Sequence, residues 1–251
     1  MFRIIAYKYC LIFIVFAVLA GCQNVAGPVG EERLVIKTIS KWKVDTLNDS
    51  KIARVVFKEF DKTGFLVLQE DFTNEGKIVT KSTYTYDSEK SLEEKSSFTE
   101  TGEVKDKSKT EYVYDRNRRV IKQINYDGNG VVNDIHTFDY DSNGNLIKKT
   151  QTYSNTGNVT NVNIDYQYNQ TGELVERVTK NETGNLSRDS ISYQSELKKV
   201  TVFRFNSEGK LSTSTCYNYN ELGSIISEMI TDYFTDIRSK YIYEYTYFTI
   251  K

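Results

Sequence analysis

Proline is almost absent from this chain, which contains a single one, Pro28, among 251 residues. Proline interrupts β-ladders because it lacks a backbone donor, so a long stretch without it is compatible with continuous sheet. After the N-terminal region no segment shows sustained helical periodicity, and Tyr, Thr, Val, Ile and Phe fill alternating positions. The composition favours an all-β fold.

Residues that commonly build reactive centres are also scarce. The chain has one histidine, His136, and three cysteines. With no second histidine, no nearby cysteine and no Ser-x-Gly elbow, neither a zinc site nor a catalytic triad can be assembled around His136, which we interpret as an ordinary strand residue. Carboxylates are abundant, but their spacing singles out no acid pair. We therefore expect no enzyme activity, no catalytic residue, no metal and no cofactor.

Neither sign of charge is in large excess, since 33 basic side chains face 34 acidic ones. Proteins that bind nucleic acid usually carry a strong basic excess. We therefore expect no nucleic-acid partner.

The N-terminus differs from the rest of the chain. Arg3 and Lys8 give it a basic start, and a continuous apolar run follows from about residue 10 to residue 20. That run is short for a membrane span and has the proportions of a signal peptide. It ends in Leu19-Ala20-Gly21-Cys22, which resembles the lipobox of bacterial lipoproteins. An ordinary secretory signal with a chance cysteine is the alternative.

The lipobox resemblance implies cleavage before Cys22, a diacylglyceryl group on its sulfur and often a fatty acid such as palmitate on the new amino group. Two or more acyl chains anchor a protein stably at a membrane. Gln23 in place of Asp favours the outer membrane under the sorting rule of enteric bacteria. We thus expect a signal peptide at 1–21, a lipidated tether at 22–33 and one β-repeat domain at 34–251.

Processing would leave Cys216 as the one unmodified cysteine, because Cys10 is removed and Cys22 is acylated. A single thiol forms no disulfide framework. We interpret Cys216 as a small, partly buried strand residue.

A repeat governs the chain from about residue 57 onward, and its best-preserved copy runs from Phe138 to Ile147. Each copy has an aromatic residue, a polar turn that usually holds Gly, and then an aliphatic residue. The pre-turn aromatic recurs in a first series of Phe60, Tyr86, Tyr114, Tyr140, Tyr168, Tyr193, Tyr219 and Tyr245. A second series falls between these positions and comprises Phe72, Phe98, Tyr126, Tyr153, Lys180, Phe205 and Tyr233. The unit is about 13 residues, and two units make a double repeat of 26–27 residues.

Thirteen residues hold one strand and one tight turn, with no room for the helical crossover that parallel strands need. The sequence predicts an antiparallel meander of about 15 strands. Aromatic pairs spaced i, i+2, such as Tyr84 and Tyr86, share one face of the sheet, and the other face is rich in polar residues. Because twist accumulates over many strands, we expect the sheet to coil into a roll or an open or wide barrel that encloses the aromatic face.

The segment Tyr140-Asp141-Ser142-Asn143-Gly144-Asn145-Leu146 resembles the Tyr-Asp-x-x-Gly-x-Leu core of YD, or RHS-type, repeats. Tyr114-Asp115 and Tyr86-Asp87 match its first half, with Arg118 and Lys90 in place of the glycine. The chain is similar, too, to small repeat lipoproteins of Gram-negative bacteria. Its period is longer than that of RHS repeats, and its array is too short for their toxin-enclosing shell. The resemblance implies β-hairpins and an envelope setting, and it does not imply toxin delivery.

Three stretches remain as candidate sites. Asp139, Asp141 and Asn143 fit the start of an EF-hand calcium loop, but Thr150 stands where the bidentate Glu is needed, so we assign these residues to the turn. The turn at 127–130 is rich in glycine and could be a contact tip. The tyrosine-rich segment at 241–248 would be a sheet edge open to a partner strand unless it closes against the first strand.

These patterns favour a membrane-anchored, non-enzymatic repeat lipoprotein that acts as a structural or protein/glycan-interaction scaffold, since repeat arrays offer extended surfaces. The alternatives are an integral outer-membrane β-barrel and an enzyme that acts on the cell wall. Lys and Glu on many strands, with no clear apolar band, disfavour the integral barrel.

Overall fold

The computed structural model describes residues 33–89, 91–99, 101–155 and 158–250. The predicted signal peptide, Cys22 and nearly all of the predicted tether lie outside the described residues. No helix in the part of the chain that the structure describes is long and apolar enough to cross a membrane.

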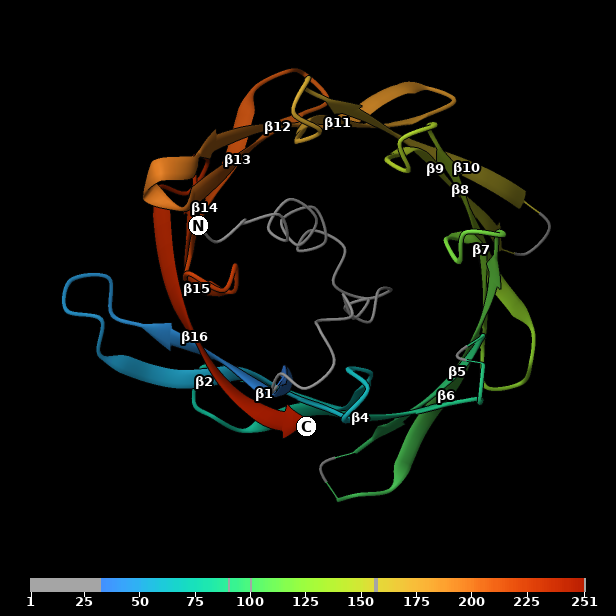
Figure 1. The fold of residues 1–251 in the computed structure, drawn as a ribbon, viewed down its shortest axis with the longest axis horizontal. Helices are drawn as coiled ribbons and strands as arrows, with labels where there is room; N and C mark the ends of the chain where they lie inside the picture. The colour runs from blue at the N-terminus through green and yellow to red at the C-terminus, as the bar shows by residue number, and fades with distance from the viewer. Residues whose placement is uncertain (1–32, 90, 100, 156–157, 251) are drawn as a thin grey trace.

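Sixteen antiparallel strands follow one another around a closed barrel, and the colour order runs once around the ring in Figure 1. They are β1 (Arg33–Val44), β2 (Lys51–Phe60), β3 (Leu66–Phe72), β4 (Ile78–Tyr86), β5 (Leu92–Phe98), β6 (Val104–Tyr114), β7 (Val120–Tyr126), β8 (Val132–Tyr140), β9 (Leu146–Asn155), β10 (Asn158–Tyr168), β11 (Leu174–Asn181), β12 (Gly184–Gln194), β13 (Lys199–Asn206), β14 (Leu211–Tyr219), β15 (Ile225–Asp232) and β16 (Ile237–Ile250). One 3-10 turn, η2 (Ser195–Leu197), joins β12 to β13. The all-β meander and its coiling into a barrel are confirmed.

The first and last strands close the barrel. β1 pairs with β16 from Arg33↔Ile250 to Val44↔Lys240, with one irregularity between Ile36 and Thr38. The tyrosine-rich segment at 241–248 therefore pairs with β1 along its whole length, and its first two residues, Tyr241 and Ile242, also pair with β15, so it is not an edge open towards the first strand. Closure satisfies the backbone groups that an edge strand would leave unpaired.

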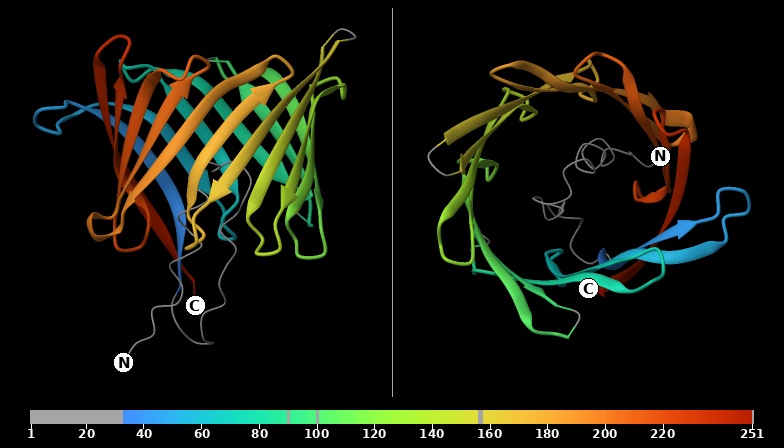
Figure 2. Two further views of the ribbon diagram at one scale, coloured as in Figure 1. Left: turned by 90° about the horizontal axis from the view of Figure 1, so that it is seen from above. Right: turned by 180° about the vertical axis from the view of Figure 1, so that it is seen from behind.

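Two rims bound the barrel. β1 begins and β16 ends at the same one, as the left view of Figure 2 shows, and we call it the N-terminal rim. The segments that connect strands at this rim are 61–65, 87–91, 115–119, 141–145, 169–173, 195–198 and 220–224. The opposite, distal rim is formed by the segments 45–50, 73–77, 99–103, 127–131, 182–183, 207–210 and 233–236. Residue 100 of this rim and residue 90 of the N-terminal rim lie outside the described residues.

The turn at 141–145 shows how the repeat makes a hairpin. Asp141 N–H donates to the Asn145 carbonyl at 2.9 Å, and Gly144 N–H donates to the Asp141 carbonyl at 3.1 Å. Gly144 has φ +86°, a left-handed conformation that favours glycine. Directly after the turn the register shifts, because Tyr140 pairs with Leu146 whereas Asp139 pairs with Lys148. This bulge leaves an extra residue unpaired and strengthens the local twist.

One face of the sheet holds all the buried side chains of the described strands except Val44, and on a closed cylinder that is the inner face, where side chains converge. Tyr112 pairs directly with Gln123, and Phe138 with Lys149, and all four side chains are buried. Directly paired residues share a face. Residues two apart along a strand also share a face, so the inner face can be traced around the whole barrel. Its other buried members include Ser82, Tyr166, Asp189 and Glu228.

Candidate functional site: the polar interior and the two rims

Tyrosines line the inside of the N-terminal rim. Four of them stand at or next to the end of a strand that a turn follows, and Tyr245 takes the equivalent position in β16, which continues to Ile250. Each donates its hydroxyl to the carbonyl of the first residue of the preceding strand. The five pairs are Tyr86–Leu66 (3.0 Å), Tyr140–Val120 (2.7 Å), Tyr168–Leu146 (2.8 Å), Tyr193–Leu174 (3.0 Å) and Tyr245–Ile225 (2.7 Å). In each case the ladder between the two strands ends two residues beyond the carbonyl, for example at Lys148↔Asp165 for Leu146, so the tyrosine hydroxyl supplies a donor that the ladder does not. The tyrosines therefore fasten neighbouring hairpins together.

The same repeat places its aromatic residue on opposite faces at the two rims. At the distal rim Phe98 pairs with Lys81, Tyr126 with Lys109 and Phe205 with Arg188, all on the outer face. Alternate strands run in opposite directions, and chirality fixes which way a side chain stands relative to its own backbone N–H and C=O. One local unit thus builds an inner aromatic ring at one rim and an outer one at the other.

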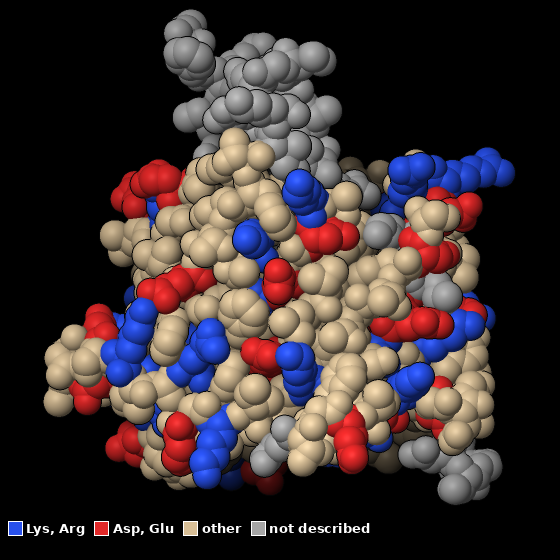
Figure 3. All heavy atoms as spheres, turned by 90° about the horizontal axis from the view of Figure 1, so that it is seen from below, with Lys and Arg blue, Asp and Glu red and all other residues tan. Residues whose placement is uncertain are grey.

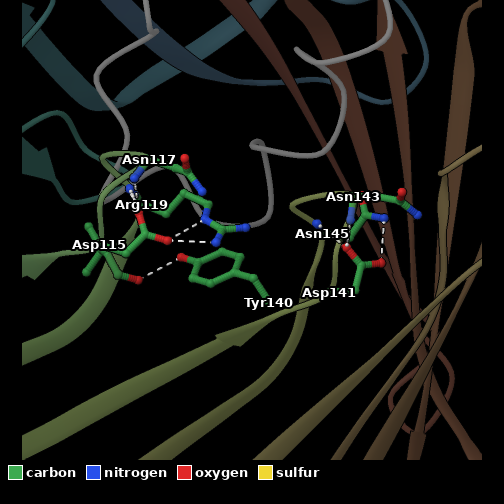
Figure 4. A network of polar contacts seen from close by, with 8 residues as sticks. Asp115, Asn117, Arg119, Tyr140, Asp141, Asn143 and Asn145 are labelled. Atoms are coloured by element: carbon green, nitrogen blue, oxygen red, sulfur yellow. Dashed lines mark hydrogen bonds and ion pairs between the residues drawn. The ribbon is translucent and has the colours of Figure 1, made fainter.

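In the candidate calcium loop, the Asp141 carboxylate is already engaged in hydrogen bonds that hold the turn. Asp141 accepts from the backbone N–H of Asn143 and Asn145 at 2.9 and 2.8 Å and from the Asn145 side chain at 2.9 Å (Figure 4). The Asn145 side chain and these backbone donors lower the pKa of Asp141. Asp139 stands on the outer face, paired with Lys148. Within the described residues, no group of three or more His, Cys, Asp or Glu is arranged to hold a metal.

Asp115 caps the equivalent turn before β7 in the same way. It accepts from the backbone of Asn117 and Arg119 at 2.8 and 2.9 Å, and from the Arg119 side chain at 2.7 Å (Figure 4). The Arg119 guanidinium also lies 4.7 Å from the ring centroid of Tyr140. The turn has lost its glycine, and Arg118 adopts φ +60° instead. The Asp therefore holds the turn even where the repeat sequence departs from its pattern.

A buried ion-pair network crosses the inner face from β11 to β13. Arg177 and Arg204 both donate to Asp189, with Nε distances of 2.9 and 2.8 Å, and Asp189 is only 3% exposed. Burial by itself would raise the pKa of Asp189, but the Arg204 hydrogen bonds and the Arg177 charge more than offset it and lower that pKa. The two guanidiniums therefore hold the carboxylate ionised inside the wall.

A second buried carboxylate lies across the seam of the barrel. Glu228 on β15 pairs with Lys41 on β1 and accepts from the Tyr243 hydroxyl at 2.7 Å. Burial and the Glu228 charge raise the pKa of Tyr243. This contact joins strands that lie at opposite ends of the sequence. It adds a side-chain link to the β1–β16 ladder.

The single histidine lies on the inner face and faces an acid. His136 Nε2 is 2.9 Å from Asp134, and Asp134 also accepts from the Asn125 side chain at 2.5 Å. Burial lowers the pKa of His136 to about 4; the nearby charge of Lys149 lowers it as well, and Asp134 opposes both. His136 is thus neutral at physiological pH. It is an inner-wall strand residue within a polar network.

These inner charges are what the sequence pattern did not reveal. The aromatic face was expected to be enclosed, and the charges were expected on the opposite, wet face. Both faces carry charges, because the aromatic residues occupy only the end of each strand near a rim. The alternation of side chains along a strand could have indicated the inner charges, because Asp189 lies four residues before Tyr193 and therefore on the same face. Their partners could not be found in this way, because pairing depends on the register between strands.

The outer wall is also polar along its height. Ion pairs join Glu70 to Lys81 (3.2 Å) and Glu176 to Arg188 (3.5 Å), and others join Lys109 to Glu111 and Asp165 to Lys180. Figure 3 shows one side of the molecule, where basic and acidic side chains are scattered from one rim to the other. Charged side chains facing lipid at the level of the hydrocarbon are costly. The described strands thus carry ion pairs on the face that an integral barrel presents to lipid.

The remaining candidates have structural positions. Cys216 pairs with Thr201 and Met229 on the outer face and is partly buried, as expected. The turn at 127–131 belongs to the distal rim, where Asp127 accepts from the backbone of Asn129 and Val131 at 2.9 and 2.8 Å. Tight-turn geometry accounts for its sequence.

No protein-family model matches the chain, and no curated protein matches it. Among solved structures, a porin-like protein from Bacteroides uniformis ATCC 8492 is 11% identical with a TM-score of 0.37, covering 84% of this chain and 96% of that one. A porin-like protein from Bacteroides vulgatus ATCC 8482 is 9% identical with a TM-score of 0.40, covering 85% and 99%. The TcdB2-TccC3-Cdc42 structure is 14% identical with a TM-score of 0.23, covering 77% and 14%. TM-scores below 0.5 do not establish a common fold, so the barrel assignment comes from the ladder of this chain itself.

Proposed function

We propose that this protein is a lipid-anchored, non-enzymatic β-barrel of the bacterial cell envelope, held by Cys22, whose wall faces water and serves as a structural or protein/glycan-interaction scaffold. The ion-paired outer wall carries the proposal. Pairs such as Glu70–Lys81 and Glu176–Arg188 stand on the face that an integral barrel would present to lipid. The lipobox supplies the attachment that such a wall cannot provide. An outer-membrane location follows from Gln23 under the enteric sorting rule.

The buried carboxylates do not favour the enzyme alternative. Asp189 is held by two arginines, and Glu228 is held by Lys41 and Tyr243. A general acid or base needs a carboxyl that can exchange its proton with a substrate near the working pH. Carboxylates locked by cations in this way instead stabilise the wall.

The anchor and the water-facing wall can be tested separately. The first measurement is incorporation of labelled palmitate in bacterial cells by the full chain and by the Cys22→Ser variant. We expect label on the full chain and none on the variant. Equal labelling of both would refute lipidation at Cys22.

The second measurement is the solubility of residues 23–251 without detergent, with the full chain as the control. We expect a monodisperse barrel in aqueous buffer, because the outer wall is charged. Precipitation that only detergent reverses, with the strand content intact, would show an integral barrel instead.

A further inference from the structure

The two rims differ in charge. Over the described residues, the seven connecting segments of the N-terminal rim hold eight acidic and five basic residues, a net charge of −3. The seven described segments of the distal rim hold eight acidic and only two basic residues, a net charge of −6. Bacterial membrane surfaces that contain anionic lipid repel acidic segments and attract basic ones. Both rims are acidic on balance, so the N-terminal rim is the one that such a surface repels less.

The basic residues of the N-terminal rim are concentrated and accessible. The β6–β7 turn contains Arg116, Arg118 and Arg119, of which Arg116 and Arg118 are exposed at the tip. Arg119 is occupied, since it pairs with Asp115. Exposed arginines suit phosphate groups, which they can contact through several donors.

Apolar side chains stand at the tips of two other turns of this rim. Leu197 in η2 is 68% exposed, and Leu222 in the β14–β15 turn is 56% exposed. Leu197 lies between Glu196 and Lys198, and Leu222 follows Glu221. Lys198 pairs with Glu221, which partly balances the charge beside the two leucines. Leu34, close to the start of β1, is exposed at the same rim. Amphipathic elements of this kind bind at a bilayer interface by burying apolar side chains while basic groups meet anionic lipid.

The position of the chain end supports the same orientation. Arg33 begins β1 at this rim and is eleven residues beyond Cys22. Eleven residues span at most about 40 Å when fully extended. The rim nearest to the anchored residue therefore stays within reach of the bilayer.

We propose that the N-terminal rim docks on the surface of the bilayer that holds the Cys22 anchor, so that the acidic distal rim points away from that membrane. The inference rests on the proposed lipid anchor. The exposed turns, with Leu197, Leu222, Arg116 and Arg118, form the contact. The partner is thus an anionic phospholipid surface, bound by interfacial leucines and arginine–phosphate contacts.

The test uses the full lipidated chain on vesicles of phosphatidylethanolamine and phosphatidylglycerol that contain brominated lipids, which quench nearby tryptophans. Trp42 is the only tryptophan of the chain and lies on β1 towards the distal rim. It is replaced by Phe, and one reporter is introduced per variant. Leu222→Trp reports on the N-terminal rim, and Leu47→Trp, at a 94% exposed distal position, is the matched control.

We expect fluorescence of the Leu222→Trp variant to fall about twofold or more, because interfacial side chains enter about 5–10 Å into the headgroup boundary. The Leu47→Trp variant should keep its intensity. Adding Arg116→Glu and Arg118→Glu to Leu222→Trp should restore much of the lost fluorescence.

Co-sedimentation with the vesicles separates the two hypotheses. Protein that sediments with vesicles while Leu222→Trp stays bright would keep the anchor and overturn the rim contact. Quenching of Leu47→Trp instead would overturn the proposed orientation. Failure to sediment would refute the anchor and, with it, the rim contact that depends on it.

Discussion

Arg177 and Asp189 face each other directly across the β11–β12 ladder, and the arginine Nε lies 2.9 Å from the buried carboxylate. Arg204 approaches the same carboxylate from β13. Removing one member of such a buried cluster costs free energy of folding, because it leaves an opposite charge without its partner. The stability of this part of the wall therefore depends on the whole cluster and not on any one pair.

Replacing Asp189 by Ala is expected to destabilise the barrel by up to about 3–5 kcal/mol, because the largely buried Arg177 guanidinium loses its counter-charge, whereas the half-exposed Arg204 is solvated. The control is Asp165→Ala, which removes an exposed outer-wall pair with Lys180 and should cost about 0–1 kcal/mol. Urea unfolding followed by circular dichroism measures both. Equal losses for the two variants would contradict the buried-cluster interpretation.

His136 should make the barrel less stable as the pH falls. The pKa of His136 is lowered to about 4 in the folded protein, against 6.5 for the unperturbed side chain. Between these values the unfolded state binds more protons, so the free energy of unfolding falls as the pH is lowered from about 6.5 towards 4, by up to about 1.4 kcal/mol per pH unit.

The measurement is the free energy of unfolding of the wild type and of His136→Gln at several pH values from 4.5 to about 7.5. Carboxylates that titrate in the acid range are common to both proteins, so the difference between the two curves isolates the histidine. Parallel curves would show that His136 keeps an ordinary pKa in the barrel.

The Tyr168→Phe variant tests the tyrosine ring of the N-terminal rim. Removing the hydroxyl leaves the Leu146 carbonyl without its donor, and we expect a loss of about 1 kcal/mol. Tyr153→Phe is the matched control, because its hydroxyl bonds only the neighbouring Gln151 side chain at an exposed position. Amide exchange at 146–148 should accelerate in Tyr168→Phe alone. Unchanged amide exchange at 146–148 would show that the rim tyrosines do not hold neighbouring hairpins together.

Removing β16 tests the seam. A chain that ends at Asp236 leaves β1 and β15 as two open edges and also loses Tyr243 from Glu228. Open edges invite pairing between molecules, so we expect the truncated protein to aggregate in size-exclusion chromatography. A synthetic peptide of residues 237–250 should restore a monomer by filling the gap. A stable, monomeric truncated barrel would show that closure is dispensable.

The repeat made much of the fold predictable. The pre-turn aromatic residues and the glycine turns specify strand length, hairpin connection and antiparallel order from local sequence alone. One strand, β1, precedes the repeat, whose first pre-turn aromatic residue, Phe60, ends β2. The closed barrel has sixteen strands where about fifteen were expected. The length of the meander and its twist predicted a roll or barrel, and pairing of the segment at 241–248 with β1 decides which of these forms.

The charged interior was less predictable for a physical reason. Asp189, Arg177 and Arg204 are separated in sequence and meet only because three strands are aligned in one register. No local pattern encodes that alignment. In contrast, Asp141 could be assigned to its turn in advance, because its partners Asn143 and Asn145 lie within four residues.

The opposite orientation of the aromatic residue at the two rims has a consequence for how such a barrel can change in size. A single 13-residue unit carries the chain from one rim to the other, so gaining or losing one unit would make the first and last strands run parallel at the seam. Only a gain or loss of a double unit restores antiparallel closure and returns every later aromatic residue to its own face. Duplication of 26–27 residues is therefore the step by which this architecture can grow, and a family of such proteins should contain barrels that differ by two strands at a time.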